Sequence, residues 1–158
     1  MTRLPALGPR GEGWVAIQAV LLVLVAWAGT LGPAWDGPAW TVTLAAGAAA
    51  MAAGGLLALR GVVDLREALT ALPHPRSGAR LIDTGAYRLV RHPIYGGIVI
   101  GAAGFGLVTS SPAALAGALV LLGFFRLKSA REEAWLEDHY PGYGTYRSRT
   151  RRMLPLLY

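Results

Sequence analysis

Four long apolar runs most constrain the fold of this 158-residue chain. Residues 14–31, 40–59 and 94–110 carry no charged side chain, and a fourth run begins near Pro112. A transmembrane helix needs about 20 apolar residues. The apolar part of the fourth run ends at Phe125, but good helix formers continue beyond it, so this helix is expected to emerge from the membrane. We therefore expect an all-α polytopic membrane protein with about four transmembrane helices, forming a single membrane domain over residues 1–158.

The connections between the runs suggest how the helices are arranged. Two prolines and two glycines place a loop at residues 32–38, so residues 14–59 are expected to form an N-terminal two-helix pair. The next connection, at residues 110–112, is so tight that helices three and four should form an antiparallel hairpin. Residues 62–72 are expected to form an interfacial helix, and the aromatic, basic tail at residues 140–158 a segment lying on the membrane surface.

The positive charges are strongly segregated. All 15 Lys and Arg residues fall before the first run, between the second and third, or after the apolar part of the fourth. By the positive-inside rule, both termini are expected in the cytoplasm. The net charge of +6 then faces an anionic leaflet, and no nucleic-acid partner is expected. The chain has no cysteine, and its three histidines lack a regular ligand spacing, so no metal site is expected.

Residues 84–97, with the sequence T-G-A-Y-R-L-V-R-H-P-I-Y-G-G, join a polar segment to the third apolar run. Proline suits the first position of a helix, and the residue before it avoids the helical conformation. We therefore expect Pro93 to open a membrane helix at the water interface. Such a helix start attracts anionic ligand groups. The alternative is that Arg88 and Arg91 only anchor the helix on an anionic leaflet, with the tyrosines forming an aromatic belt.

A second group of ionisable residues lies on helix four. Lys128 and Glu132 are four residues apart and share one helix face. Glu132 and Glu133 point to different faces, so one is expected to be functional and the other solvated. The hairpin would place this group at the level of residues 84–97. Further along helix three, the G-x-x-x-G at residues 97–101 is expected to serve helix packing.

These motifs together resemble a known family. G-x-Y-x-x-x-R-H-P-x-Y-x-G at residues 85–97 is followed by R-E-E-x-x-L at 131–136 and by Y-P-G-Y-x-x-Y ahead of a terminal L-P. This pattern resembles the isoprenylcysteine carboxyl methyltransferase family, and the related phospholipid methyltransferases share much of it. The resemblance covers residues 79–155, the expected catalytic core. It implies an integral membrane enzyme that uses S-adenosylmethionine at the cytoplasmic face, with a lipophilic substrate entering from the bilayer.

The resemblance also implies site residues. Cofactor contacts would fall on Ala79, Arg80, Leu81, Ile82, Tyr87, Arg91, His92, Pro93, Ile94, Tyr95 and Glu132. Lys128 would face the acceptor, with Arg126 and Arg131 as neighbours. The chain departs from the family pattern at Leu72, where larger relatives place a cofactor-binding glutamine. It also departs at residues 150–152, which read T-R-R in place of V-P-R.

Two alternatives remain at this stage. An NADPH-dependent sterol reductase shows a similar R-H-P-x-Y and terminal L-P pattern, although such chains are much longer. A small multi-span transporter or assembly protein is the non-enzymatic alternative, but the first three helices lack the carboxylate that a proton-coupled transporter places in the membrane. The acceptor group stays open between a carboxylate, an amine and a thiol, and so does the oligomeric state. An Ala-, Gly- and Arg-rich composition with one Lys suggests a bacterial inner membrane.

Overall fold

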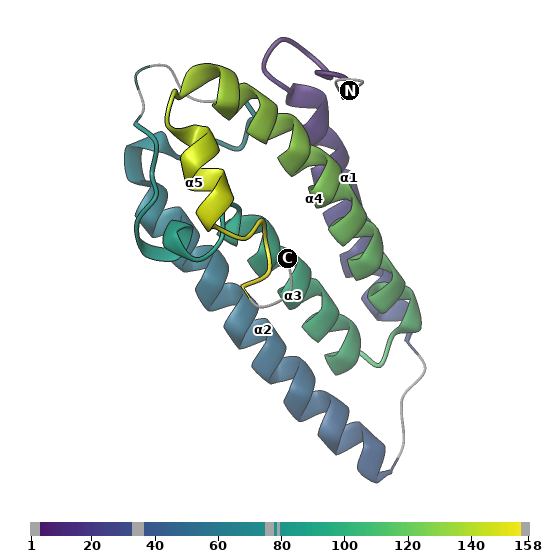
Figure 1. Ribbon diagram of the computed structural model, residues 1–158. Helices are drawn as coiled ribbons and strands as arrows, with labels where there is room; N and C mark the ends of the chain where they lie inside the picture. Colours follow the sequence, from purple (N-terminus) through teal and green to yellow (C-terminus); the bar gives the residue numbers. More distant parts are fainter. Residues whose placement is uncertain (1–3, 33–36, 75–77, 79, 156–158) are drawn as a thin grey trace.

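The computed structural model describes residues 4–32, 37–74, 78 and 80–155. Every regular element among these residues is a helix, as predicted (Figure 1). The helices are α1 (Glu12–Ala28), α2 (Pro38–Leu65), α3 (Pro93–Val108), α4 (Pro112–His139) and α5 (Tyr143–Arg149). Short 3₁₀ turns lie at η1 (Gly29–Leu31), η2 (Arg66–Ala68) and η3 (Gly85–Arg88).

The long helices pack in an order that differs from their order in the sequence. α2 packs against α3, α3 against α4, and α4 against α1 (Figure 1). The two helices within residues 14–59 therefore have different main partners. The predicted hairpin of α3 and α4 is confirmed. Ser111 closes it: its hydroxyl accepts a hydrogen bond from the Ala114 N–H (3.1 Å) and donates one to the Ala28 carbonyl (2.7 Å), which also ties α1 to the turn.

Glycines bring α2 and α3 into backbone contact. A Cβ on Gly104 would lie 2.6 Å from the Gly47 carbonyl oxygen, and a Cβ on Gly97 would lie 2.7 Å from the Ala58 nitrogen. A Cβ on Gly54 would lie equally close to the Gly101 nitrogen (2.7 Å). Such close approach is possible only without side chains. The packing interpretation of the glycines in α3 is thus confirmed.

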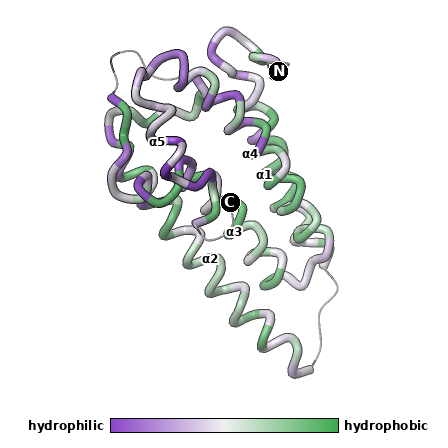
Figure 2. The backbone as a smooth tube through the Cα atoms, viewed as in Figure 1, coloured by the Kyte–Doolittle hydropathy of each residue, from purple (hydrophilic) through white to green (hydrophobic). Residues whose placement is uncertain are grey.

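Three helical segments are long and apolar enough to cross a membrane: Glu12–Leu31, α2 and α4. α3 is apolar but has only 16 residues, about 24 Å at 1.5 Å per residue, which is less than the ~30 Å hydrocarbon core. The described chain thus has three to four candidate spans. Figure 2 shows the hydrophilic residues gathered at one end of the bundle, around α5 and the C-terminal half of α4.

The segment after α2 differs from the predicted interfacial helix at residues 62–72. α2 itself continues to Leu65, because no proline interrupts it after its first turn. Arg66 then takes a positive φ of 49°, and the chain leaves the helix axis after one 3₁₀ turn. Residues 69–74 contain no regular helix. The predicted helix is therefore replaced by the end of a longer α2 and an irregular segment.

The tail also differs from the predicted surface-lying segment. Met153 is only 1% exposed and belongs to the hydrophobic core. The backbone beside it pairs with the residues before α3: Arg91 N–H donates to the Arg151 carbonyl (2.8 Å), and His92 N–H to the Arg152 carbonyl (2.9 Å). Gly96 leaves room for this segment, since a Cβ there would collide with the Met153 carbonyl. The tail thus covers the start of α3.

Candidate active site

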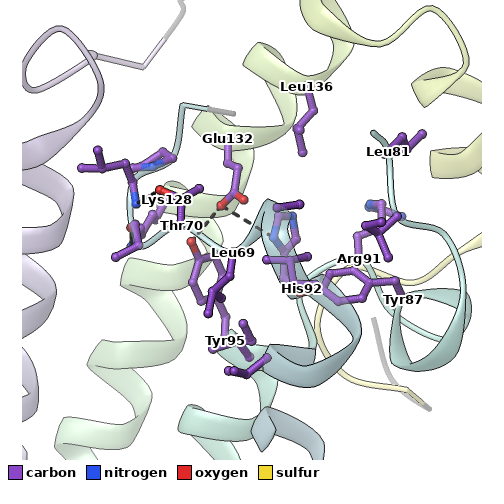
Figure 3. A pocket seen from close by; sticks show the side chains of 18 of the residues that line it. Leu69, Thr70, Leu81, Tyr87, Arg91, His92, Tyr95, Lys128, Glu132 and Leu136 are labelled. Carbon is purple, nitrogen blue, oxygen red and sulfur yellow. Dashed lines mark hydrogen bonds and ion pairs between the residues drawn. The ribbon is translucent and has the colours of Figure 1, made fainter. Parts of the chain in front are cut away.

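A cavity of about 410 Å³ opens at the hydrophilic end of the bundle. Its size lies within the range of about 300–1,000 Å³ that is common for small-molecule sites. Its walls come from α1, the end of α2, the segments on either side of residue 78, the start of α3, α4 and α5 (Figure 3). It is lined by Gln18, Val62, Leu65, Ala68, Leu69, Thr70, Ala71, Leu72, Pro73, Arg80, Leu81, Ile82, Tyr87, Arg91, His92, Ile94, Tyr95, Lys128, Glu132, Leu136, Tyr140, Tyr143 and Tyr146.

The first turn of α3 forms one wall of the cavity. Pro93 is the first helical residue, and His92 before it has non-helical dihedral angles (φ −129°, ψ 62°), as the sequence predicted. His92 makes no side-chain cap, so the first N–H groups of the helix are not satisfied by it. Ile94 and Tyr95, from this first turn, line the cavity. The positive end of the α3 dipole is therefore located at the cavity wall.

Glu132 presents its carboxylate to the cavity. The Tyr95 hydroxyl donates a hydrogen bond to Glu132 Oε2 (2.8 Å), and His92 Nδ1 lies 3.8 Å from the same oxygen (Figure 3). The rings of His92 and Tyr95 stack in parallel, with centroids 5.3 Å apart, and Tyr95 also stacks on Phe125 at 4.6 Å. These stacked rings hold the two groups that orient Glu132.

Glu133 faces a different side of α4 and is more deeply buried than Glu132, with a side chain only 3% exposed against 23%. Its Oε1 accepts a hydrogen bond from Arg91 Nε (2.8 Å) and lies 3.2 Å from His92 Nε2. Its Oε2 accepts from Arg152 Nη2 (3.1 Å). The expectation that one of the paired acids is solvated is therefore wrong. The two do face different sides, but the returning tail covers the second side.

Tyrosines from η3 and α5 close the outer wall. The Tyr146 hydroxyl donates to the Tyr87 carbonyl (2.7 Å). Burial raises the pKa of Tyr87, Tyr143 and Tyr146 well above the usual value, so their hydroxyls stay protonated as hydrogen-bond donors. The Tyr143 hydroxyl is buried and has no hydrogen-bond partner within the described part of the chain. It is a polar group on the cavity wall that a ligand can satisfy.

Lys128 occupies the other side of the cavity. Figure 3 places it on one side of Glu132, with Tyr87 and Leu81 on the opposite side. Its side chain is buried at 1% exposure, and its Nζ donates to Gln18 Oε1 (2.5 Å) and to the Ala71 carbonyl (3.4 Å). The ammonium also lies 5.0 Å from the centroid of the Tyr95 ring.

Most of the residues that the sequence singled out gather around this cavity. The ones that line it are Arg80, Leu81, Ile82, Tyr87, Arg91, His92, Ile94, Tyr95, Lys128 and Glu132. Pro93 is buried at the start of α3, and Ala79 lies outside the described residues. Arg126 and Arg131 are not part of the lining. The Arg131 guanidinium instead lies over the Trp135 ring, 4.0 Å from its centroid.

Sequence reasoning missed several wall residues. The segment at 68–73 carries no motif that points to a pocket. The tyrosines of the tail belong to the family pattern, but they were not assigned to the site. Leu72, which stands where larger relatives have a glutamine, does line the cavity. Gln18 had one available signal: it is the only amide side chain of the whole chain, and it interrupts an apolar run.

Comparison with known families adds an independent observation. The model of the family described as phospholipid methyltransferase matches residues 42–142, which is more than half of the chain. The matched region includes most of α2, all of α3 and α4, and many of the cavity residues described above. No curated protein matches the chain.

Proposed function

Because the chain belongs to the phospholipid methyltransferase family, we propose that it transfers a methyl group to a lipophilic acceptor in the cavity beside Glu132. The family is related to the isoprenylcysteine carboxyl methyltransferases, and its members are membrane enzymes that use S-adenosylmethionine as methyl donor. A lipid acceptor follows from the family. The location of the site beside Glu132 is our proposal.

The residues of the cavity fit S-adenosylmethionine. The observation that carries this assignment is the Glu132 carboxylate, which Tyr95 and His92 hold at the cavity wall. A carboxylate suits an ammonium group or ribose hydroxyls. The buried Tyr143 hydroxyl, which has no partner among the described residues, offers a further donor. The donor's own carboxylate suits the start of α3. Arg91 lines the cavity beside it and adds positive charge there, although its Nε is bonded to Glu133.

When bound, S-adenosylmethionine supplies a methyl group activated by a sulfonium centre. Transfer of such a methyl needs little acid–base help, so the chain has to orient the reactants and exclude water. The ring faces of Tyr87 and Tyr95 suit a cationic centre. The apolar wall at Val62, Leu65 and Leu69 keeps water out and suits the chain of a lipid.

The cavity is proposed to face the cytoplasm. It lies at the end of the bundle that carries the positive charges, and such loops stay on the cytoplasmic side. Both termini would then be cytoplasmic, in what we propose is a bacterial inner membrane. The two alternative functions, an NADPH-dependent reductase and a transporter or assembly protein, are less well supported. The R-H-P-x-Y motif lies within the region that matches the phospholipid methyltransferase family.

Calorimetry on the detergent-purified protein tests the site. We expect micromolar binding of S-adenosylmethionine and no binding of NADPH. Glu132→Ala should abolish binding, while Tyr95→Phe and His92→Ala should weaken it, because each removes part of the arrangement that presents the carboxylate. Arg10→Ala is the matched control, since Arg10 lies outside the cavity lining. Wild-type affinity for S-adenosylmethionine in folded Glu132→Ala protein would show that the cofactor binds at another place. Binding of NADPH without binding of S-adenosylmethionine would favour the reductase function instead.

A further inference from the structure

A second cleft lies at the hydrophilic end of the bundle, where α5 and the C-terminal half of α4 come together (Figure 2). Its volume is about 520 Å³, which is enough for a small ligand group. It is lined by Arg91, Glu137, Gly144, Arg147, Ser148, Thr150, Arg151 and Arg152. Most of these residues follow residue 142, where the match to the family ends, and the proposed function does not use them.

Arginines dominate this cleft, and two of them are held in place. The Arg91 and Arg152 side chains are only 8% and 17% exposed. Both contact Glu133, which is buried and does not line the cleft: Arg91 Nε donates to Oε1 (2.8 Å) and Arg152 Nη2 to Oε2 (3.1 Å). Guanidinium groups fixed in this way lose little conformational freedom when they bind a ligand.

The positive charge of the cleft exceeds the negative charge around it. Arg147 lies 3.2 Å from Glu137 and 3.8 Å from Glu133, so two carboxylates serve the four guanidinium groups of the lining. Arg151 is exposed, and no carboxylate within the described part of the chain forms an ion pair with it. A cleft lined by charges of one sign concentrates counter-ions. This cleft therefore attracts an anion.

Arg151 is also a departure from the family pattern, because it stands where V-P-R has its proline. Its N–H donates to the Leu89 carbonyl (3.4 Å), a hydrogen bond that a proline cannot make. The Leu89 side chain is 59% exposed. An exposed apolar residue on the segment that pairs with Arg151 suits a ligand that carries an apolar chain as well as an anionic group.

We propose that this arginine cleft is a second binding site, which takes a phosphate group with net negative charge. Guanidinium groups match phosphate oxygens in geometry and bind them through charge-assisted hydrogen bonds. An anionic lipid headgroup and a soluble phosphate compound are the two sources of such a group, and the exposed Leu89 next to Arg151 favours the lipid. The inference does not depend on methyl transfer.

A phosphate in the arginine cleft would fasten the tail to the start of α3. Arg147 lies on α5 and Arg151 in the tail, whereas Arg91 precedes α3. These residues come together only in the folded chain. A ligand that binds the folded chain and not the unfolded one raises the melting temperature.

Thermal unfolding and calorimetry of the detergent-purified full chain test the site. The probes are short-chain phosphatidic acid, inorganic phosphate and short-chain phosphatidylcholine, whose headgroup has no net charge. We expect phosphatidic acid to raise the melting temperature, with an effect that weakens as NaCl is added, and phosphatidylcholine to leave it unchanged. Weaker binding of inorganic phosphate assigns the ligand as a lipid, and equal binding assigns it as a soluble phosphate compound.

Three variants locate the binding. Arg151→Gln should lower the affinity for phosphatidic acid about tenfold, because it removes a charged hydrogen-bond donor. Arg151→Lys keeps the charge without the planar guanidinium, so its affinity should lie between those of Arg151→Gln and wild type. Arg88→Gln is the matched control: it removes the same charge from an exposed residue of η3 that does not line the cleft, and it should keep wild-type affinity.

Wild-type affinity for phosphatidic acid in Arg151→Gln would overturn the inference. An equal loss of affinity in Arg88→Gln would do the same, because the charge of the whole surface would then account for the binding. Equal binding of phosphatidylcholine and phosphatidic acid, or no binding of either phosphate probe to wild type, would also exclude a phosphate site in the arginine cleft.

Discussion

The interface between α2 and α3 and the cluster around Glu133 hold α3 in place by opposite means. Along α2, the contact is backbone against backbone, with glycines such as Gly54 and Gly97 where side chains would collide. At the start of α3, the buried Glu133 carboxylate contacts Arg91 and His92, which precede α3, and Arg152 from the tail. The stability of the α2–α3 interface therefore depends on small side-chain volume, and the stability of the Glu133 cluster depends on charge.

The two regions should therefore tolerate different substitutions. The glycine interface is packed backbone against backbone, so any added side-chain atom should lower its stability. The Glu133 cluster is joined by directional hydrogen bonds between charged groups, so it should respond to loss of charge even when the shape is kept. The substitutions below are designed to break one region while leaving the other intact.

The largest effect is expected from Glu133→Gln. This change keeps the side-chain shape but leaves Arg91 and Arg152 without their shared counter-charge, and breaking a buried ion pair costs about 3–5 kcal/mol. The free energy of unfolding, measured by denaturant titration in detergent, should fall by about that amount. Glu137→Gln is the matched control, because the Glu137 side chain is 51% exposed in its contact with Arg147. Equal stability of the two variants would rule out a structural role for the Glu133 charge.

A smaller loss is expected from Gly97→Ala. The new methyl group would meet backbone atoms of Gly54 and Ala58, which cannot move without separating α2 from α3. Overpacking of this kind costs about 1–3 kcal/mol, and the same unfolding titration measures it. Gly101→Ala, one turn further along the same helix, adds its methyl group to open space and should be neutral or slightly stabilising, because Ala favours a helix more than Gly does. Similar losses in both variants would show that the loss does not come from the contact of Gly97 with α2.

Tyr146→Phe should cost about 1 kcal/mol, since it removes one hydrogen bond and leaves the buried Tyr87 carbonyl without its donor. Thermal unfolding of the purified protein reports the change. Ser148→Ala removes a hydroxyl from the same helix, where it bonds only to the exposed Thr145 carbonyl. We expect that variant to unfold at the wild-type temperature. If both variants behave alike, the contact between α5 and η3 does not stabilise the fold.

The smallest effect concerns alkaline pH. Burial raises the pKa of Tyr87, Tyr143 and Tyr146 in the folded state above the unfolded value of about 10. Below pH ~10 both states hold these protons, and their contribution to stability is complete. Above it the unfolded state releases protons first, so stability should fall as the pH rises. The fall in melting temperature between neutral pH and pH ~11 should be shallower in Tyr146→Phe. A parallel fall in both proteins would assign the effect to other groups.

Much of the fold could be predicted because its signals are local. The lengths of the apolar runs predicted the helices, and Pro93 and Pro112 indicated where two of them begin. The short connection at residues 110–112 predicted the hairpin. The end of α2 could not be predicted, since it depends on Arg66 adopting a positive φ that its surroundings impose. The path of the tail could not be predicted, because no pattern in the residues around Met153 indicates that this side chain is buried.

The candidate site divides in the same way. Tyr95, Lys128 and Glu132 stood out because their type and spacing are unusual beside apolar helices. Glu133 could not be assigned, because α4 alone presents it to an open side, and only the returning tail supplies Arg152. Gln18 was visible as an interruption of an apolar run, but its partner lies 110 residues away in the chain.

A helical membrane protein could be predicted from the amino-acid sequence, because the length of an apolar run is a property of neighbouring residues. The methyltransferase assignment came from motifs that resemble the isoprenylcysteine carboxyl methyltransferases and the related phospholipid methyltransferases. Tertiary structure alone decided that α1 packs on α4, that the tail closes over α3, and that Gln18 meets Lys128. Those pairings depend on shape and on the satisfaction of buried polar groups between distant segments. No local pattern in the chain encodes them.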